Sequence, residues 1–278
     1  MLLGCGGLGR KLAQQLLTAG HRVVAIKRSA PPALVPGLDV IVADITLQSA
    51  MDKLPVDVDQ VVVLLAPAQR NENAYRQLYH RGLQNVLGHF ASAGVEPHWL
   101  LVSSTSVYAQ CSGEWVDEDS PAQASCFNGR ALLEAEQDLW AHSDKSTVLR
   151  FSGIYGPGRE SLLRRVRDGV PVQDDPPYYT NRIHEADCVG ILCFLIARRV
   201  AAKPLEKLYL ASDSAPAPLA EVALWLSQTM DCRPPAKLGD STHKNSNKRC
   251  SNRKLLALGY ALRYPTYRQG YSELLGTA

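Results

Sequence analysis

A glycine-rich stretch near the N-terminus has the spacing needed to bind phosphate groups. The segment GCGGLG, residues 4–9, reads Gly-x-Gly-x-x-Gly and lies between a short apolar run and an amphipathic segment. Gly4 permits a tight turn, Gly6 lets a pyrophosphate approach the backbone, and Gly9 lets the following helix pack against the strand. That helix would present free N–H groups and its positive dipole end to the phosphates. A glycine-rich turn without a ligand is the alternative interpretation.

The residues after the second predicted strand indicate which dinucleotide would bind. An acidic residue there would bind the ribose 2′-hydroxyl of NAD, whereas an arginine accommodates the 2′-phosphate of NADP. The chain has Lys27, Arg28 and Ser29 at this point and no acidic neighbour. We therefore expect NADP, with NAD as the alternative, although Lys27 and Arg28 could simply end an exposed strand. Asp44 follows the third strand and could bind the adenine amino group or cap a surface helix.

A parallel sheet would position these residues. Short apolar runs alternate with helical patterns; strands are predicted near 1–5, 22–27, 40–42, 60–65, 99–103 and 146–151, and helices at 9–19, 73–93 and 129–142. This order predicts an α/β protein with a doubly wound parallel-sheet Rossmann fold.

The rhythm of the pattern changes after residue 153, where glycines and prolines separate short elements. We expect a dinucleotide-binding Rossmann core over residues 1–153. Residues 154–278 would complete this core and form a small substrate-binding α/β part, with helices at 185–200 and 217–230. Only three residues precede Gly4, fewer than a core strand usually needs, so we expect native residues before Met1.

The composition is typical of a globular protein and excludes several classes. The net charge of +3 is too small to indicate a nucleic-acid partner. The densest basic run, residues 243–249, is interpreted as a solvated loop, or alternatively as a site for an anionic substrate tail. Seven scattered cysteines without a CxxC pair favour reduced thiols in the cytoplasm over disulfides or a metal site. No apolar run reaches about 18 residues and no signal peptide is evident, so we expect no membrane partner.

Several motifs resemble those of a known enzyme group. The glycine loop is followed, in order, by VADIT (42–46), VSSTSVYA (102–109), DEDSP (117–121), LRFSGIYGPGR (149–159), NRIHEADCV (181–189) and LYLASD (208–213). The chain thus resembles the extended short-chain dehydrogenase/reductases, the NAD(P)-dependent epimerase/dehydratase group that acts mainly on nucleotide sugars. GCGGLGR resembles an atypical branch of that group. The resemblance implies oxidoreduction or epimerisation of a nucleotide sugar or a related carbonyl compound.

The same resemblance implies roles for individual residues. Ser104 matches the catalytic Ser/Thr that hydrogen-bonds the reacting oxygen. Arg159 and Arg182 could hold a substrate diphosphate, or be solvated surface arginines. A homodimer through the helices at 73–93 and 129–142 is also implied. The implied cofactor-binding residues are Gly4, Gly6, Gly7, Leu8, Gly9, Lys27, Arg28, Asp44, Ile45, Leu65, Ala66, Ser103, Arg130, Phe151, Ser152 and Ile154.

One motif departs from the family pattern at its proton-handling residues. The family places a tyrosine, and a lysine four residues later, on the first turn of the helix that begins in FNGRALLEAE (127–136). Here Asn128 and Leu132 occupy those places, and a shift of one residue would offer only Phe127 and Ala131. Neither Asn nor Leu exchanges a proton at physiological pH.

Three interpretations of this loss remain open. The chain could be an enzyme whose acid/base lies elsewhere, with Tyr178, Tyr179, His184 or the fixed charge of Arg130 as candidates. It could instead be a cofactor-binding sensor or scaffold without hydride chemistry. It could also be a slow reductase in which Ser104 and water move the proton. His184 could titrate near neutral pH or be a structural hydrogen-bonding residue.

Overall fold

The computed structural model describes residues 1–30, 35–238 and 246–277, which form two compact units that share the chain. We call them unit 1 and unit 2. Unit 1 consists of Met1–Val107, Ala124–Arg150 and Val189–Tyr209, and unit 2 consists of Tyr108–Gln123, Phe151–Cys188 and Leu210–Ala278. The predicted division into a core over 1–153 and a substrate-binding segment over 154–278 stays a prediction.

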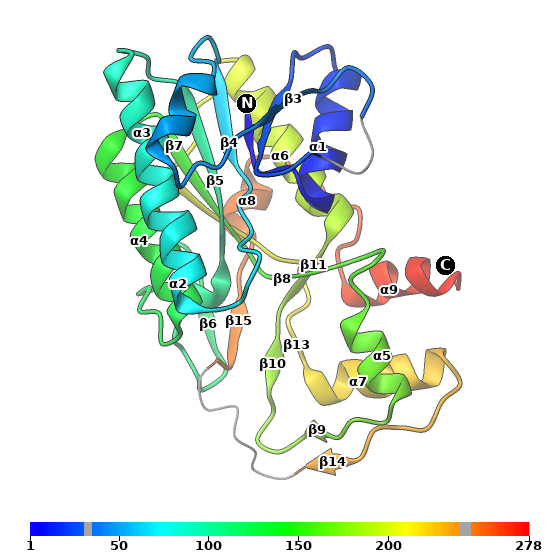
Figure 1. The fold of residues 1–278 in the computed structure, drawn as a ribbon. Coiled ribbons are helices and arrows are strands. Elements are labelled where there is room, and N and C mark those ends of the chain that lie inside the picture. Colours follow the sequence, from blue (N-terminus) through cyan, green and yellow to red (C-terminus); the bar gives the residue numbers. More distant parts are fainter. Residues whose placement is uncertain (31–34, 239–245, 278) are drawn as a thin grey trace. The chain divides into compact units, whose positions relative to one another are not determined.

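A seven-stranded sheet forms the centre of unit 1 (Figure 1). Its order is β12-β7-β5-β4-β1-β2-β3, and the pairs β1–β2, β1–β4, β2–β3 and β4–β5 are parallel. The order reverses at β1, which is where doubly wound sheets bind ligands. The predicted doubly wound α/β fold is thereby confirmed. The strands are β1 Leu2–Leu3, β2 Val24–Lys27, β3 Asp39–Val42, β4 Gln60–Val63, β5 His98–Ser104, β7 Ser146–Phe151 and β12 Leu208–Ala211.

The central strands are apolar because both faces of the sheet are covered. Leu3, Val61 and Leu101 are completely buried, and each such side chain contributes about 1.5–3 kcal/mol relative to exposure. Strand β3, at the edge, contains no fully buried residue. The apolar runs therefore predicted the strands, and the sheet order explains why the central ones are buried on both faces.

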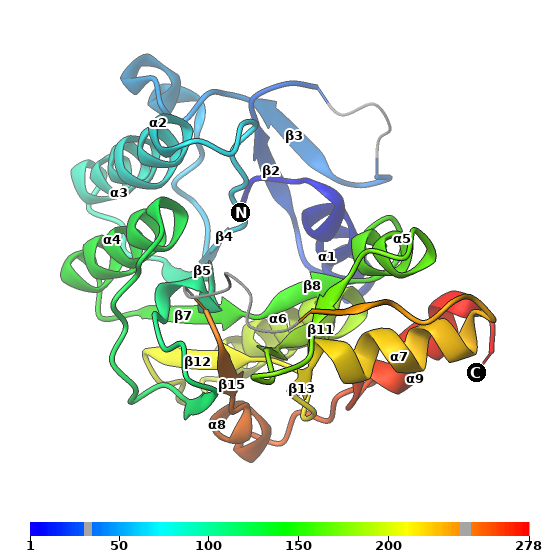
Figure 2. The same cartoon turned by 90° about the horizontal axis from the view of Figure 1, so that it is seen from below.

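Helices cover both faces of this sheet (Figure 2). On one face, α2 Glu72–Tyr75, the π-helical η2 Arg76–Gly82 and α3 Leu83–Ser92 form a continuous rod beside α4 Phe127–His142. This rod is the helix predicted over 73–93. On the other face lie α1 Gly7–Thr18 and α6 Glu185–Val200, whose first turn belongs to unit 2. Two 3₁₀ segments, η1 Gln48–Lys53 and η3 Thr105–Val107, complete the unit.

Unit 2 is built from short paired strands and helices. The parallel pairs are β8–β11, β9–β14 and β6–β15, and β10–β13 is antiparallel. An apolar cluster that includes Leu163, Val222 and Leu226 forms its core. The elements are β6 Glu114–Val116, β8 Gly153–Tyr155, α5 Ser161–Arg167, β9 Val172–Gln173, β10 Tyr179–Thr180, β11 Arg182–His184, β13 Ala217–Pro218, α7 Leu219–Thr229, β14 Lys237–Leu238, β15 Lys248–Cys250, α8 Arg253–Ala257 and α9 Tyr267–Leu275.

The basic run predicted as a solvated loop is partly corrected. Residues 243–245 lie outside the described residues, but Ser246 and the residues after it are described. Lys248 belongs to β15 and is buried, and its Nζ donates to the carbonyl oxygen of Tyr108 and to Ser246 Oγ. The solvated-loop prediction is therefore wrong for Lys248, because two oxygen acceptors compensate the burial of its ammonium group.

Candidate functional site

The glycine loop connects β1 to α1 and is closely packed on one side and open on the other. Gly4 has φ +90°, and a Cβ there would lie 2.5 Å from the carbonyl oxygen of Leu64. A Cβ on Gly9 would lie 2.9 Å from the carbonyl oxygen of Gly4. By contrast, a Cβ on Gly6 or Gly7 would meet nothing within 4 Å. Gly4 and Gly9 are thus required by the fold, whereas Gly6 and Gly7 leave space in front of the helix N-terminus.

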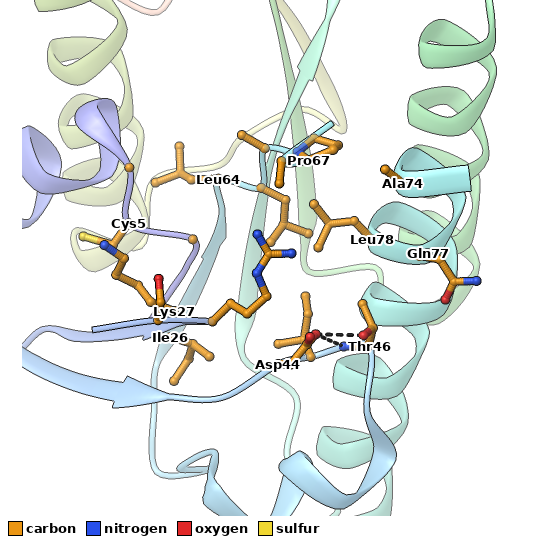
Figure 3. A pocket seen from close by; sticks show the side chains of 18 of the residues that line it. Cys5, Ile26, Lys27, Asp44, Thr46, Leu64, Pro67, Ala74, Gln77 and Leu78 are labelled. Atoms are coloured by element: carbon orange, nitrogen blue, oxygen red, sulfur yellow. Dashed lines mark hydrogen bonds between the residues drawn. The ribbon is translucent and has the colours of Figure 1, made fainter. Parts of the chain in front are cut away.

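A cavity of about 530 Å³ opens beside this loop (Figure 3). Its volume lies within the range of about 300–1,000 Å³ typical of small-molecule sites. It is lined at the carboxyl ends of β2, β3 and β4, beside the switch point at β1. The space, the glycine loop and the free N–H groups of α1 fit a dinucleotide. The predicted cofactor-binding residues that line the cavity are Gly4, Gly6, Lys27, Arg28, Asp44, Ile45, Leu65 and Ala66.

Asp44 is held in a fixed orientation in this cavity. Its Oδ1 accepts hydrogen bonds from the backbone N–H and the hydroxyl of Thr46, at 3.0 and 2.7 Å (Figure 3). Sequence reasoning did not assign a role to Thr46, although the Asp-x-Thr spacing is typical of such local side-chain turns. These two bonds orient Asp44 as an acceptor, and no long-range partner for it lies in the described part of the chain.

A second group of lining residues was missed at the sequence level. Ala74, Gln77 and Leu78, from α2 and η2, line the cavity on the side facing the strand ends (Figure 3). Their spacing i, i+3, i+4 puts them on one helical face. This periodicity was available in the sequence, but it predicts only that the face is covered, and it does not distinguish a cofactor from another helix.

Cys5 lies within the loop in an environment that disfavours its thiolate form. The side chain is buried, and burial raises the pKa of the thiol, an effect that nearby Lys27 and Arg10 partly oppose. A thiol with a raised pKa carries little thiolate at neutral pH. Leu8, another predicted cofactor-binding residue, is buried on α1, where its side chain packs in the unit.

The two serines at the end of β5 differ in how their hydroxyls are used. Ser103 is buried and donates to Glu136, which is paired with Arg150 through bonds that include Nε to Oε1 at 3.0 Å. Ser104 Oγ accepts from the N–H of Ser106 at 3.1 Å, and none of the described residues accepts its hydroxyl proton. The hydroxyl of Ser104 can therefore donate to a further group, whereas that of Ser103 already donates to Glu136.

The first turn of α4 is filled by packing. A Cβ on Gly129 would collide with the carbonyl oxygen of Ser106, so the turn is pressed against η3. The ring of Phe127 meets that of Tyr75 edge-on, with centroids 5.5 Å apart. Leu132 is buried, with an exposed fraction of 5%. The place of the family's lysine is therefore an apolar core position.

Arg130 does not replace that lysine in the described conformation. Its Nη1 donates to the carbonyl oxygen of Ser125 at 3.1 Å, and its Nη2 lies 3.6 Å from Glu72. Half of the side chain is exposed. The guanidinium is thus held at the outer end of the helix by two neighbours, and its predicted cofactor role stays a prediction.

The remaining candidates lie in unit 2 and occupy different environments. Phe151 and Ser152 are buried, and Ile154 lies half-buried in β8. Arg159 is partly exposed, with Nε 3.9 Å from Glu185. Arg182 is buried, donates to Thr180 Oγ1 and lies over the ring of Tyr267.

Two of the predicted proton donors of unit 2, His184 and Tyr179, also differ in their environments. His184 is buried between the rings of Tyr155 and Tyr264, and its Nδ1 accepts from the N–H of Ala186. Burial lowers the pKa of His184, against the opposing effects of nearby carboxylates, so its imidazole is neutral at neutral pH. This moves its titration below the neutral range considered from the sequence. Tyr179 is half-buried and carries an arginine against its ring.

The described residues contain no group of three or more His, Cys, Asp or Glu that could hold a metal ion. No helix in the described ranges is long and apolar enough to cross a membrane.

The sheet order and the glycine loop define a Rossmann-type α/β protein. A family model described as the NAD dependent epimerase/dehydratase family matches residues 2–187, and the chain belongs to that family. A candidate NAD-dependent epimerase/dehydratase from Methylobacillus flagellatus is 36% identical over 99% of this chain and 96% of its own, with a TM-score of 0.81. A comparison with curated proteins found no match.

Two more distant structures share the fold. UDP-glucose 4-epimerase from Thermotoga maritima is 15% identical, with 99% of this chain and 97% of its own covered and a TM-score of 0.82. MoeE5, solved with UDP-glucose and NAD, is 23% identical, with 98% and 95% covered and a TM-score of 0.79. Family membership supports a nicotinamide dinucleotide cofactor for this chain.

Proposed function

We propose that this chain is an NADP(H)-dependent oxidoreductase or epimerase that acts on a nucleotide sugar or a related carbonyl compound. The observation that carries the proposal is the cavity at the glycine loop, with Lys27 and Arg28 in its lining and no acidic residue directly after β2. The loop and the N-terminus of α1 would hold the pyrophosphate, and the two cations would hold a 2′-phosphate. A bound nicotinamide would supply hydride exchange with a substrate carbon.

Ser104 supplies the chain's own contribution to the reaction. Its free hydroxyl proton, at the carboxyl end of β5, donates a hydrogen bond to the substrate oxygen and stabilises charge there. Tyr179 and His184 remain the proposed proton donors, and neutral His184 would act through its Nε2, which has no hydrogen-bond partner among the described residues. Arg159 and Arg182 remain the proposed substrate-binding residues.

A second function is favoured by one specific observation. Leu132 is buried where the family has a lysine, and Asn128 takes the place of the tyrosine. The two changes remove the family's own proton-handling residues, and neither residue lines the cofactor cavity. The alternative is therefore a dinucleotide-binding sensor or scaffold that performs no hydride chemistry.

Cofactor preference is tested by comparing NADPH and NADH dissociation constants. We expect tighter NADPH binding, and we expect Arg28→Ala to reduce that preference by about 10-fold, as for the loss of a charge-assisted contact. Lys53→Ala, at an exposed position on η1, is the matched control. Tighter binding of NADH than of NADPH would overturn the NADP assignment. NAD is the alternative to test because MoeE5 and another structure of this fold were solved with NAD.

Catalysis is tested by following NADPH absorbance with nucleotide-sugar 4-keto compounds and small carbonyl compounds. Turnover supports the enzyme, and binding without turnover across the panel supports the sensor. Because MoeE5 was solved with UDP-glucose, that compound is the first nucleotide sugar to test for binding. The homodimer through the helices at 73–93 and 129–142 stays a prediction, and so does the cytoplasmic location. All seven cysteines are free thiols.

A further inference from the structure

One arginine of unit 2 is clamped between two aromatic rings. The guanidinium carbon of Arg249 lies 5.2 Å from the ring centroid of Trp115 and 4.8 Å from that of Tyr179. The pairing of β15 with β6 places Arg249 directly beside Trp115. Arg249 Nε donates to the carbonyl oxygen of Gly113 at 2.7 Å. Two ring faces and one hydrogen bond thus fix the plane and the direction of the guanidinium.

The frame around this arginine is itself tightly built. Asn247 is buried, and its Oδ1 accepts from the N–H of Tyr179 at 2.8 Å while its Nδ2 donates to the carbonyl oxygen of Pro177. The N–H of Gly113 donates to the carbonyl oxygen of Asn247 at 2.7 Å. Gly113 has φ +80°, and a Cβ there would lie 3.3 Å from the Tyr179 ring. The backbone of Tyr179 is therefore anchored to the Asn247 side chain, and the backbone of Gly113, two residues before Trp115, is anchored to the Asn247 backbone.

The outer end of the guanidinium is left for another partner. Arg249 is only half-buried, and within the described part of the chain no carboxylate pairs with it and only its Nε forms a hydrogen bond. Two other arginines of unit 2 lie near carboxylates instead: Arg159 near Glu185, and Arg263 near Glu273. A planar guanidinium with a fixed orientation and two unengaged terminal nitrogens has the geometry for bidentate binding of an oxyanion.

We propose that Arg249 binds an oxyanion of the substrate, a carboxylate or a phosphate, through its two terminal nitrogens. This inference rests on the proposed function for the kind of substrate, a nucleotide sugar or a related compound. Arg249 belongs to the basic run 243–249, for which an anionic substrate tail was the alternative interpretation. The two rings and the hydrogen bond around Arg249 identify which residue of that run would bind the anion and how its guanidinium is oriented.

The test measures binding of UDP, UDP-glucose and UDP-glucuronic acid to the full chain by titration calorimetry, with and without NADPH. Arg249→Gln is compared with Arg253→Gln, an exposed arginine at the start of α8. We expect Arg249→Gln to weaken binding by about 10- to 100-fold and Arg253→Gln to change it less than 2-fold. Loss for all three probes identifies a phosphate, and loss for UDP-glucuronic acid alone identifies a carboxylate.

Two further variants test the planar shape of the Arg249 guanidinium and the aromatic wall beside it. Arg249→Lys keeps the charge without the planar fork and should restore only part of the affinity. Trp115→Leu removes one wall at a side chain that is 56% exposed, so the fold should tolerate it, and we expect binding to weaken about 3- to 10-fold. Unchanged affinity in Arg249→Gln and Trp115→Leu, or a wild-type chain that binds none of the probes, overturns the proposal. Failure of the proposed function would appear separately, as absence of NADPH binding or of turnover.

Discussion

The glycine loop and the first turn of α4 both belong to unit 1, and they use their residues in different ways. Around the loop, small residues and strand ends leave a cavity of about 530 Å³. At the α4 turn, Phe127 packs on Tyr75 and Leu132 is buried, so the turn is filled by its own side chains. Dinucleotide binding depends mostly on backbone shape, whereas proton transfer depends on two particular side chains. The residues for proton transfer can therefore be lost while the dinucleotide-binding loop and the fold are kept.

The largest expected effect concerns the buried ion pair between Glu136 of α4 and Arg150. If this helix is now structural, Glu136→Gln should lower the free energy of unfolding by about 3–5 kcal/mol, because it removes the negative charge that pairs with the buried guanidinium of Arg150. NADPH affinity of the folded protein should stay within 2-fold. Chemical denaturation and fluorescence titration give the two values. Glu134→Gln, exposed on the same helix, should change stability by less than about 0.5 kcal/mol; equal effects of the two variants would contradict the structural role.

The next effect tests the chemistry attributed to β5. Where turnover is found, Ser104→Ala should lower kcat by about 10²–10³-fold, as for the loss of one donor to a developing charge. The NADPH dissociation constant should not change, because the cavity lining does not include Ser104. Ser125→Ala, at an exposed position just before α4, is the control. Turnover that survives Ser104→Ala would remove Ser104 from the mechanism.

A smaller loss is expected when the family's lysine is put back. Leu132→Lys should destabilise the fold by about 2–4 kcal/mol, because the new ammonium group would enter an apolar core position. Leu132→Met, which conserves volume, should cost less than about 1.5 kcal/mol. Thermal unfolding of both variants measures these two losses of stability. A fully stable Leu132→Lys variant with tighter NADPH binding would mean that the turn is still a cofactor site.

The smallest effect concerns the other region. Asp44→Ala removes the acceptor that Thr46 holds in the cavity, and NADPH binding should weaken by about 5- to 10-fold, as for one hydrogen bond. Asp39→Ala, at an exposed position that starts β3, serves as the control. Equal affinities for wild type and Asp44→Ala, measured by fluorescence titration, would show that Asp44 only shapes the local turn.

Local and distant interactions explain which features the sequence could predict. Short sequence patterns predict the strands and the glycine loop, and the strands lie within one or two residues of the expected places. The absence of the tyrosine and the lysine is likewise read directly from the sequence. The cavity lining by Ala74 and Gln77 depends on which face of a helix meets the strand ends, which a single sequence does not give. The burial of Lys248 and the stacking of Arg249 on Trp115 depend on the pairing of β15 with β6, whose residues lie more than 100 positions apart in the sequence. A run of charges cannot reveal such partners.

The path of the chain also limits how the protein can be divided. The chain passes between the two units after Val107, Gln123, Arg150, Cys188 and Tyr209, and the fourth passage lies inside helix α6. No single proteolytic cut or gene fragment would therefore release either unit with all of its segments. If Arg249 binds the substrate as proposed, fusing one half of a gene to another would not exchange the substrate preference. That preference would instead change through substitutions at positions far apart in the sequence, such as 115, 179 and 249.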